Sequence, residues 1–114
     1  MNNQLEVVET VQQLRAATQR LSEASKQVFK LAKERAVTER VYRMELAKEI
    51  ATLRHQGVQA TLIPDLARGH VAELKEERDF AHEMHRSAMS SIGALQVEIQ
   101  SWQSILRIMD EVEK

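Results

Sequence analysis

The second half of the chain carries hydrophobic positions at alternating spacings of four and three residues. This spacing is the heptad repeat, in which one stripe of a helix packs against a partner helix. A second stripe with the same spacing runs through the first half. In the second half the stripe comprises Ala67, Val71, Leu74, Arg78, Ala81, His85, Ala88, Ile92, Leu95, Ile99, Trp102, Leu106 and Met109, and in the first half Val7, Val11, Leu14, Thr18, Leu21, Ser25, Val28, Ala32, Arg35, Glu39, Tyr42, Leu46 and Leu53.

Glycine and proline mark the boundary between two predicted helices. The first helix is predicted over about residues 4–55, because Gly57 suits the left-handed residue that follows a helix C-terminus. A linker over 57–63 follows. Pro64 favours the first turn of a second helix over about 64–112. Gly69 weakens the first turns of this helix, which allows a start as late as His70.

The two stripes match if the chain folds back near residue 60, so that paired residue numbers add up to about 120. In this register Leu14 faces Leu106, and Val28 faces Ile92. The small Thr18 falls opposite the large Trp102, as close packing requires. The sequence therefore predicts an all-α fold, in which residues 1–114 form a single antiparallel coiled-coil hairpin of two long helices.

The middle of the predicted seam is polar. Arg35 falls opposite His85, Tyr42 opposite Arg78, and Glu39 lies between these layers. Polar groups in a seam lower stability but fix the register of the helices. One interpretation is a partly hydrated layer that sets this register. The alternative is a pH-sensitive or ligand-binding layer with His85 as the switch.

More apolar residues are present than one pair of seams can bury. Because they point away from the partner helix, we expect them to form an interface through which the chain associates with itself. The simplest assembly is a homodimer that forms a helical bundle. The predicted interface comprises Val37, Val41, Met44 and Ala51 of the first helix and Met89, Val97, Ile105 and Ile108 of the second.

The linker region is also apolar, through Val58, Leu62, Ile63 and Leu66. These residues either cap the end of the core or form an adhesive tip for a partner protein.

The amino-acid composition favours long helices and argues against several classes of function. Only 4% of residues are aromatic, 29% are charged, the net charge is −1 and there is no cysteine. No segment has the roughly 20 apolar residues that a membrane-spanning helix needs, so the expected location is the cytoplasm. Neither a phosphate-binding glycine loop nor a nucleophile elbow is present, and we expect no enzymatic activity.

A metal site is considered because His82 and His85 lie three residues apart, on neighbouring helical positions. Metal sites in helical bundles need several inward carboxylates, and only Glu39 is well placed to supply one. The expectation is therefore that these histidines are solvated, and that no metal or cofactor is bound.

Charge is distributed unevenly between the two predicted helices. The acidic stretch 73–83 of the second helix falls beside the basic part of the first. Complementary flanking charges fix helix orientation in coiled coils. The alternative is a nucleic-acid-binding stripe along the first helix, which lacks an aromatic platform for bases. The basic residues of that stripe are Lys26, Lys30, Lys33, Arg40, Arg43 and Lys48.

Residues 77–89 resemble a segment of short helical proteins that temperate bacteriophages encode near their replication and recombination genes. The residues that carry the likeness are Arg78-Asp79, Ala81, Met84 and Ala88. The resemblance implies an accessory protein that contacts a protein or nucleoprotein partner, and it supplies no catalytic residues.

Two functions are therefore expected. The first is a non-enzymatic, oligomeric protein-interaction module that acts as an adaptor, assembly factor or inhibitor. The alternative is an accessory factor for DNA replication or recombination that binds nucleic acid through the basic stripe.

Overall fold

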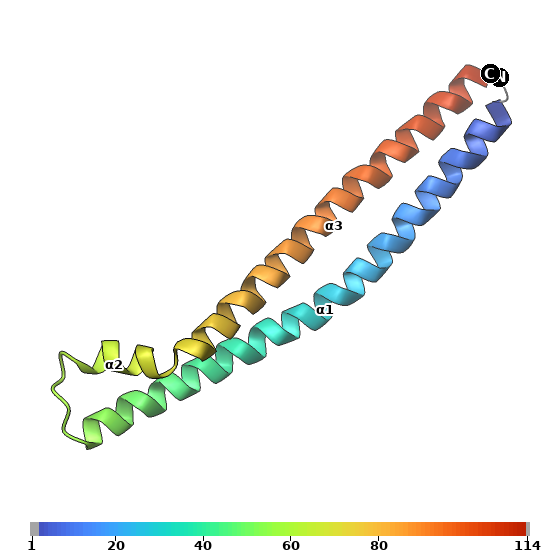
Figure 1. Cartoon of the computed structure of the whole chain (residues 1–114). Helices are drawn as coiled ribbons and strands as arrows, with labels where there is room; N and C mark the ends of the chain where they lie inside the picture. Colours follow the sequence, from blue (N-terminus) through green and yellow to red (C-terminus); the bar gives the residue numbers. More distant parts are fainter. Residues whose placement is uncertain (1–2, 114) are drawn as a thin grey trace. The chain divides into compact units, whose positions relative to one another are not determined.

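A computed structural model describes residues 3–113. Over this range the fold is all-α and has three helices, α1 (Asn3–His55), α2 (Ile63–His70) and α3 (Ala72–Glu113) (Figure 1). The predicted end of the first helix at residue 55 is confirmed. The predicted second helix, in contrast, is divided into α2 and α3.

The chain forms two compact units. Unit 1 consists of Met1–Phe29 with Ser87–Lys114, and unit 2 of Lys30–Arg86. Both α1 and α3 contribute residues to each unit. The expectation of a single domain over residues 1–114 stays a prediction.

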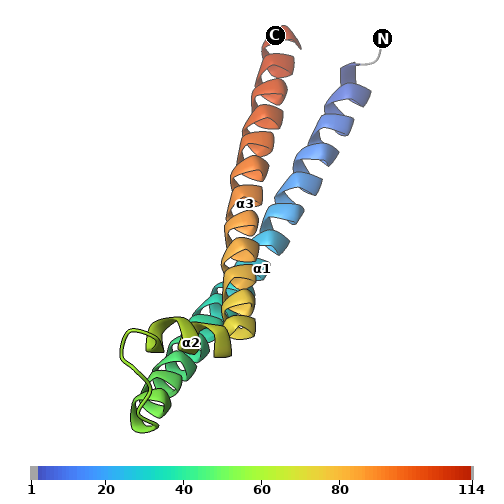
Figure 2. The ribbon, with the colours of Figure 1, turned by 60° about the vertical axis from the view of Figure 1, so that its left-hand side comes forward.

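In unit 1 the first half of α1 and the second half of α3 run side by side in opposite directions (Figures 1 and 2). Thr10 Oγ1 lies 3.8 Å from the sulfur of Met109. Farther along, Arg20 forms an ion pair with Glu98. These pairs confirm the predicted antiparallel direction and register, because their numbers add up to about 120.

The seam of unit 1 follows the predicted stripes except at two levels, where Thr10 and Ala17 are the buried residues. Leu14, Leu21 and Val28 are partly buried, as expected. Thr18 is exposed, and its hydroxyl donates a hydrogen bond to the Leu14 carbonyl oxygen. Ala17 is instead fully buried, with 0% exposure. The predicted seam position of Thr18 is therefore wrong, because the neighbouring Ala17 takes the buried position at this level.

Unit 2 is also antiparallel. Arg35 contacts His85, with 3.4 Å between the guanidinium and Nδ1 of the imidazole. Nearer the end of α1, Glu49 Oε2 lies 2.9 Å from His70 Nδ1. The predicted pairing of Arg35 with His85 is thereby confirmed.

The C-terminus of α1 is closed by a Schellman motif. Gly57 has φ +76°, and its amide donates to the Arg54 carbonyl oxygen at 3.0 Å. The Val58 amide donates to the Leu53 carbonyl oxygen at 3.1 Å. Because Val58 also packs against the cluster that contains Leu53, the apolar contact typical of this motif is present. Gly57 thus has the role that the sequence predicts.

The turn places α2 against the end of α1 (Figure 1). Ile63 and Ala67 are four residues apart and share the buried face of α2, where they pack with Leu53. Leu46 and Ile50 of α1 complete the cluster. This tip core is the main buried apolar cluster of unit 2 among the described residues.

One residue, Val71, separates α2 from α3. Its backbone has φ −113° and ψ 21°, although its amide still donates to the Ala67 carbonyl oxygen at 3.3 Å. Gly69 and the β-branched Val71 both have low helix propensity. Val71 is buried, with 5% exposure. We infer that packing of this face onto α1 bends the helix where its intrinsic preference is weakest.

Candidate functional site

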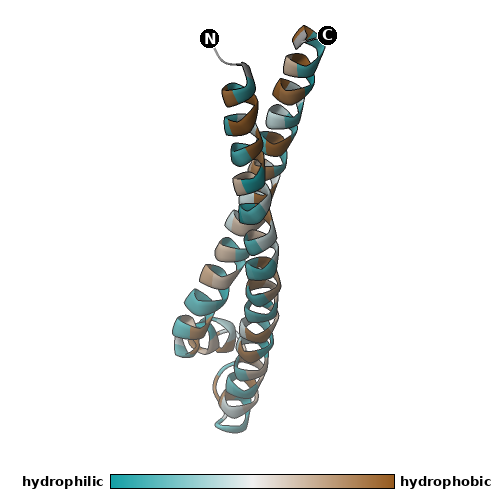
Figure 3. Ribbon diagram, turned by 90° about the vertical axis from the view of Figure 1, so that its right-hand side faces the viewer, coloured by the Kyte–Doolittle hydropathy of each residue, from teal (hydrophilic) through white to brown (hydrophobic). Residues whose placement is uncertain are grey.

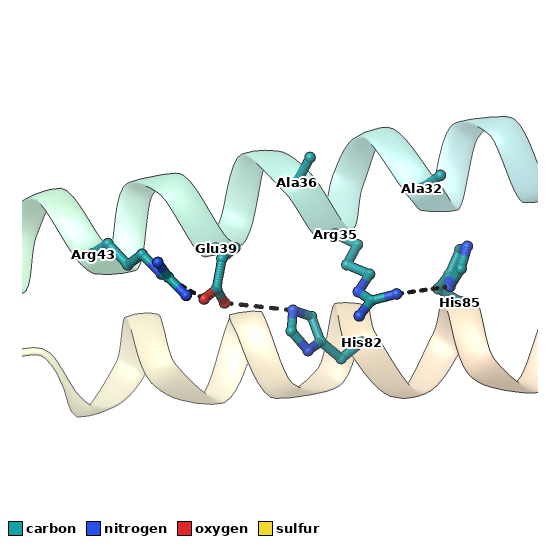
Figure 4. Close-up of a pocket in the computed structure, with 7 residues that line it drawn as sticks. All are labelled: Ala32, Arg35, Ala36, Glu39, Arg43, His82 and His85. Carbon is teal, nitrogen blue, oxygen red and sulfur yellow. Dashed lines mark hydrogen bonds and ion pairs between the residues drawn. The ribbon is translucent and has the colours of Figure 1, made fainter.

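The polar layer of unit 2 borders an open cavity of about 470 Å³ between α1 and α3 (Figure 4). Figure 4 shows His82 directed toward Glu39, and Arg35 directed toward His85. The lining residues are Ala32, Arg35, Ala36, Glu39, Arg43, His82 and His85.

Glu39 is the acidic centre of this cavity. Its Oε1 accepts a 2.7 Å hydrogen bond from Arg43 Nε, one helical turn along α1. Its Oε2 lies 3.5 Å from both Arg78 Nε and His82 Nε2. These are ion-pair distances without hydrogen-bond geometry, and within the described residues neither Glu39 Oε2 nor His82 Nε2 has a hydrogen-bond partner.

Tyr42 and Arg78 form the neighbouring polar layer that the sequence predicts. The Arg78 guanidinium carbon lies 4.4 Å from the Tyr42 ring centroid, which is a cation–π distance. Arg78 also donates hydrogen bonds to Asp79 at 2.9 and 3.1 Å. The hydrogen bonds and charge of Asp79 raise the pKa of Arg78, so this group stays a cation.

The predicted switch residue, His85, pairs with a cation. The Arg35 guanidinium can only donate, so the 3.4 Å contact with His85 Nδ1 requires an unprotonated acceptor nitrogen. The contact between Arg35 and His85 is consistent with a role in setting the register of the helices. It does not by itself form a ligand-binding site.

The Glu39 carboxylate is stabilised in its charged form. The hydrogen bond from Arg43, together with the positive charges of Arg43, Arg78 and His82, lowers the pKa of Glu39 below its ordinary value of 4.5, although partial burial opposes this shift. A lowered folded-state pKa contributes stability above the ordinary value, and this contribution is lost as the pH falls through the folded-state pKa.

Replacing Glu39 with glutamine is therefore expected to remove part of the acid sensitivity of unit 2. Urea unfolding would be measured between about pH 3 and pH 6 for the wild type, Glu39→Gln and the exposed control Glu34→Gln. The stability difference between wild type and Glu39→Gln should be largest above pH 4.5 and shrink in acid. A difference that stays constant over the whole range would contradict this assignment.

The histidine pair does not assemble a metal centre. His82 turns toward Glu39, whereas His85 turns toward Arg35 (Figure 4). Within residues 3–113 no group of three or more histidine, cysteine, aspartate or glutamate side chains could hold a metal ion.

The predicted oligomer interface is exposed to different degrees. On α1, Met44 is 51% exposed and Ala51 is exposed, whereas Val37 and Val41 are partly buried. Hydrophobic and hydrophilic residues are interspersed along the helices (Figure 3). The α3 members of the interface are all exposed, with Met89 at 49%, Val97 at 61%, Ile105 at 38% and Ile108 at 56%.

The apolar tip residues fall into two groups. Val58 and Ile63 pack into the tip core with Leu53. Leu62 and Leu66 remain exposed, at 52% and 42%. The capping interpretation therefore holds for Val58 and Ile63, whereas a partner contact through Leu62 and Leu66 stays a prediction.

The basic stripe is only partly available to a partner. Arg43 is hydrogen-bonded to Glu39, and Lys48 lies 3.2 Å from Glu45. Lys26, Lys30, Lys33 and Arg40 are exposed. Within the described residues, no ion pair joins this stripe to the acidic stretch 73–83. The expected electrostatic complementarity of the two stretches stays a prediction.

Acidic side chains surround Phe80, which the sequence pattern did not mark as a functional residue. Phe80 is 66% exposed and lies off the heptad seam. A phenylalanine outside the seam, within an acidic stretch, was the available signal. The residues that line the hollow around it are Glu73, Glu76, Glu77, Asp79, Phe80 and Glu83.

None of the helices within residues 3–113 has the length and apolar character needed to cross a bilayer. Comparisons with protein-family models, curated proteins and solved structures find no match to this chain.

Proposed function

We propose that the protein is a non-enzymatic helical interaction module that associates with itself. The observation that carries this proposal is the apolar surface left outside the seams. Met44, Val97 and Ile108 are each more than half exposed on regular helices. Large apolar side chains that stay exposed outside the seams are typical of protein interfaces, and a homodimer is the commonest soluble assembly.

The polar cavity supports a structural role beside this surface. Its one carboxylate, Glu39, is held by Arg43, and Arg35 is directed to His85. No nucleophile with an adjacent base arises from these contacts. The cavity residues fix the register of α1 and α3, which in turn fixes the faces that a partner meets.

The test is light scattering on a sizing column with the full-length chain. Wild-type protein is expected to be a dimer at micromolar concentration, and Val41→Glu combined with Met44→Glu should yield a monomer with unchanged helicity. The matched control, Val41→Ile with Met44→Leu, keeps the surface apolar and should remain dimeric. A wild-type monomer, unaffected by either pair, would reject the proposal.

A further inference from the structure

The surface around Phe80 in unit 2 combines an exposed aromatic ring with an apolar hollow. Phe80 and Met84 are 66% and 41% exposed, one turn apart on α3. A hollow of about 230 Å³ lies beside them and extends to Leu31 and Thr38 of α1. Large apolar side chains at the rim of a preformed hollow are the usual anchors of a protein interface.

Acidic side chains frame this ring. Glu76 and Glu77 lie four and three residues before Phe80, and Glu83 lies three residues after it, so all are its neighbours on the helix surface. Glu73 continues the same side of α3. Within residues 3–113, Glu73, Glu76 and Glu77 form no ion pair. We call Glu73, Glu76, Glu77, Phe80 and Glu83 the acidic face.

The outer side of α1 in unit 2 has the complementary character. Lys33, Val37, Arg40 and Met44 follow spacings of four, three and four, and therefore share one helical stripe. Lys33 and Arg40 are exposed and form no ion pair among the described residues. Met44 supplies an apolar side chain that is 51% exposed. We call these four residues the basic face.

We propose that the acidic face of one copy binds the basic face of a second copy. This inference rests on the proposed self-association and specifies its contacts. The basic face and the acidic face carry opposite charges, and each also contains exposed apolar side chains. The two faces form no ion pair with each other inside unit 2. In a twofold dimer, each copy presents both faces, so the same contact forms twice.

The chemistry of the contact follows from its parts. Met44 and Val37 would cover the Phe80 ring and the adjoining hollow. Lys33 and Arg40 would meet Glu76, Glu77 and the neighbouring carboxylates at the rim. Charge pairs at a rim fix the orientation of partners and raise the association rate, whereas the apolar centre supplies most of the affinity.

The test is a charge exchange in the full-length protein. One variant carries Glu76→Lys and Glu77→Lys, and the other carries Lys33→Glu and Arg40→Glu. Each variant alone should dissociate at a concentration about tenfold or more above that of the wild type, because like charges then face each other. An equimolar mixture should recover a dimer with one copy of each variant, since both contacts regain opposite charges. Circular dichroism verifies that each variant stays helical.

Matched controls separate this inference from the proposed function. Glu9→Lys with Glu111→Lys reverses two exposed acids outside the acidic face and should leave the dimer unchanged. A wild-type dimer whose stability is unaffected by either charge variant would overturn this contact but keep self-association. Failure of the mixture to restore the dimer would also overturn it, whereas a monomeric wild type would overturn both proposals.

A different occupant is tested in the same series. A synthetic amphipathic helix rich in lysine and leucine is titrated into the wild-type protein and into Phe80→Asp. If the peptide binds a wild-type monomer and Phe80→Asp abolishes this binding, the acidic face receives a basic helix of another protein, and the second copy is rejected as its occupant.

Discussion

Replacing Leu53 with alanine is expected to lower the free energy of unfolding by about 2–5 kcal/mol, the usual cost of truncating a buried leucine. Leu53 is only 6% exposed and is the member of the tip core that contacts both Ile63 and Ala67 of α2. Its carbonyl oxygen also accepts the Val58 amide hydrogen bond, which a side-chain truncation leaves in place. The loss therefore reports side-chain packing.

The matched control is Leu66→Ala in α2. Leu66 is 42% exposed, so its truncation removes much less buried surface and should change stability by about 1 kcal/mol or less. Alanine has the higher helix propensity in both variants, so propensity cannot explain a loss. Urea unfolding followed by circular dichroism measures both. Equal effects of the two substitutions would show that the tip core does not hold α2 against α1.

The second large effect is expected for Ala17→Asp in unit 1. Ala17 is fully buried at 0% exposure, so a carboxylate at this position loses its hydration against the facing helix. An unpaired buried charge typically lowers stability by about 3–5 kcal/mol. We expect a loss of about 3 kcal/mol in the free energy of unfolding, measured by urea titration at neutral pH.

Ala16→Asp is the control for this prediction. Ala16 is exposed and adjacent to Ala17, so both variants lose the same intrinsic helix propensity, about 0.6 kcal/mol. If the two substitutions cost the same, Ala17 does not face α3, and the seam at this level follows Thr18 as the sequence suggested.

In the proposed dimer, the residues that stabilise each copy differ from the residues that join the two copies. Stability resides in the tip core and in the seams, whereas the acidic and basic faces lie outside them. Substitutions in the faces should therefore change association and leave the fold of a single copy intact. Substitutions such as Leu53→Ala should destabilise the fold and leave association unchanged, at protein concentrations where the dimer persists.

The sequence alone predicted the features that depend on local periodicity and on backbone preference. The heptad spacing predicted two antiparallel helical stretches whose facing residue numbers add up to about 120. The pairs Arg35 with His85 and Tyr42 with Arg78 follow from this register. Gly57 was identified as the residue that follows the C-terminus of α1, because glycine adopts φ +76° without strain.

Only the tertiary structure decided features that depend on which side of a stripe meets the neighbouring helix. A heptad pattern places Ala17 and Thr18 almost equally near the seam, and three-dimensional packing selected the alanine. Likewise, Gly69 and Val71 weaken a helix without fixing a bend, and the break at Val71 was seen only in the structure, where Ile63 and Ala67 of α2 pack with Leu53 of α1. The acidic stretch was visible as a charge run. The hollow that its side chains line around Phe80 depended on helix rotation, which residue spacing constrains only to within about one position.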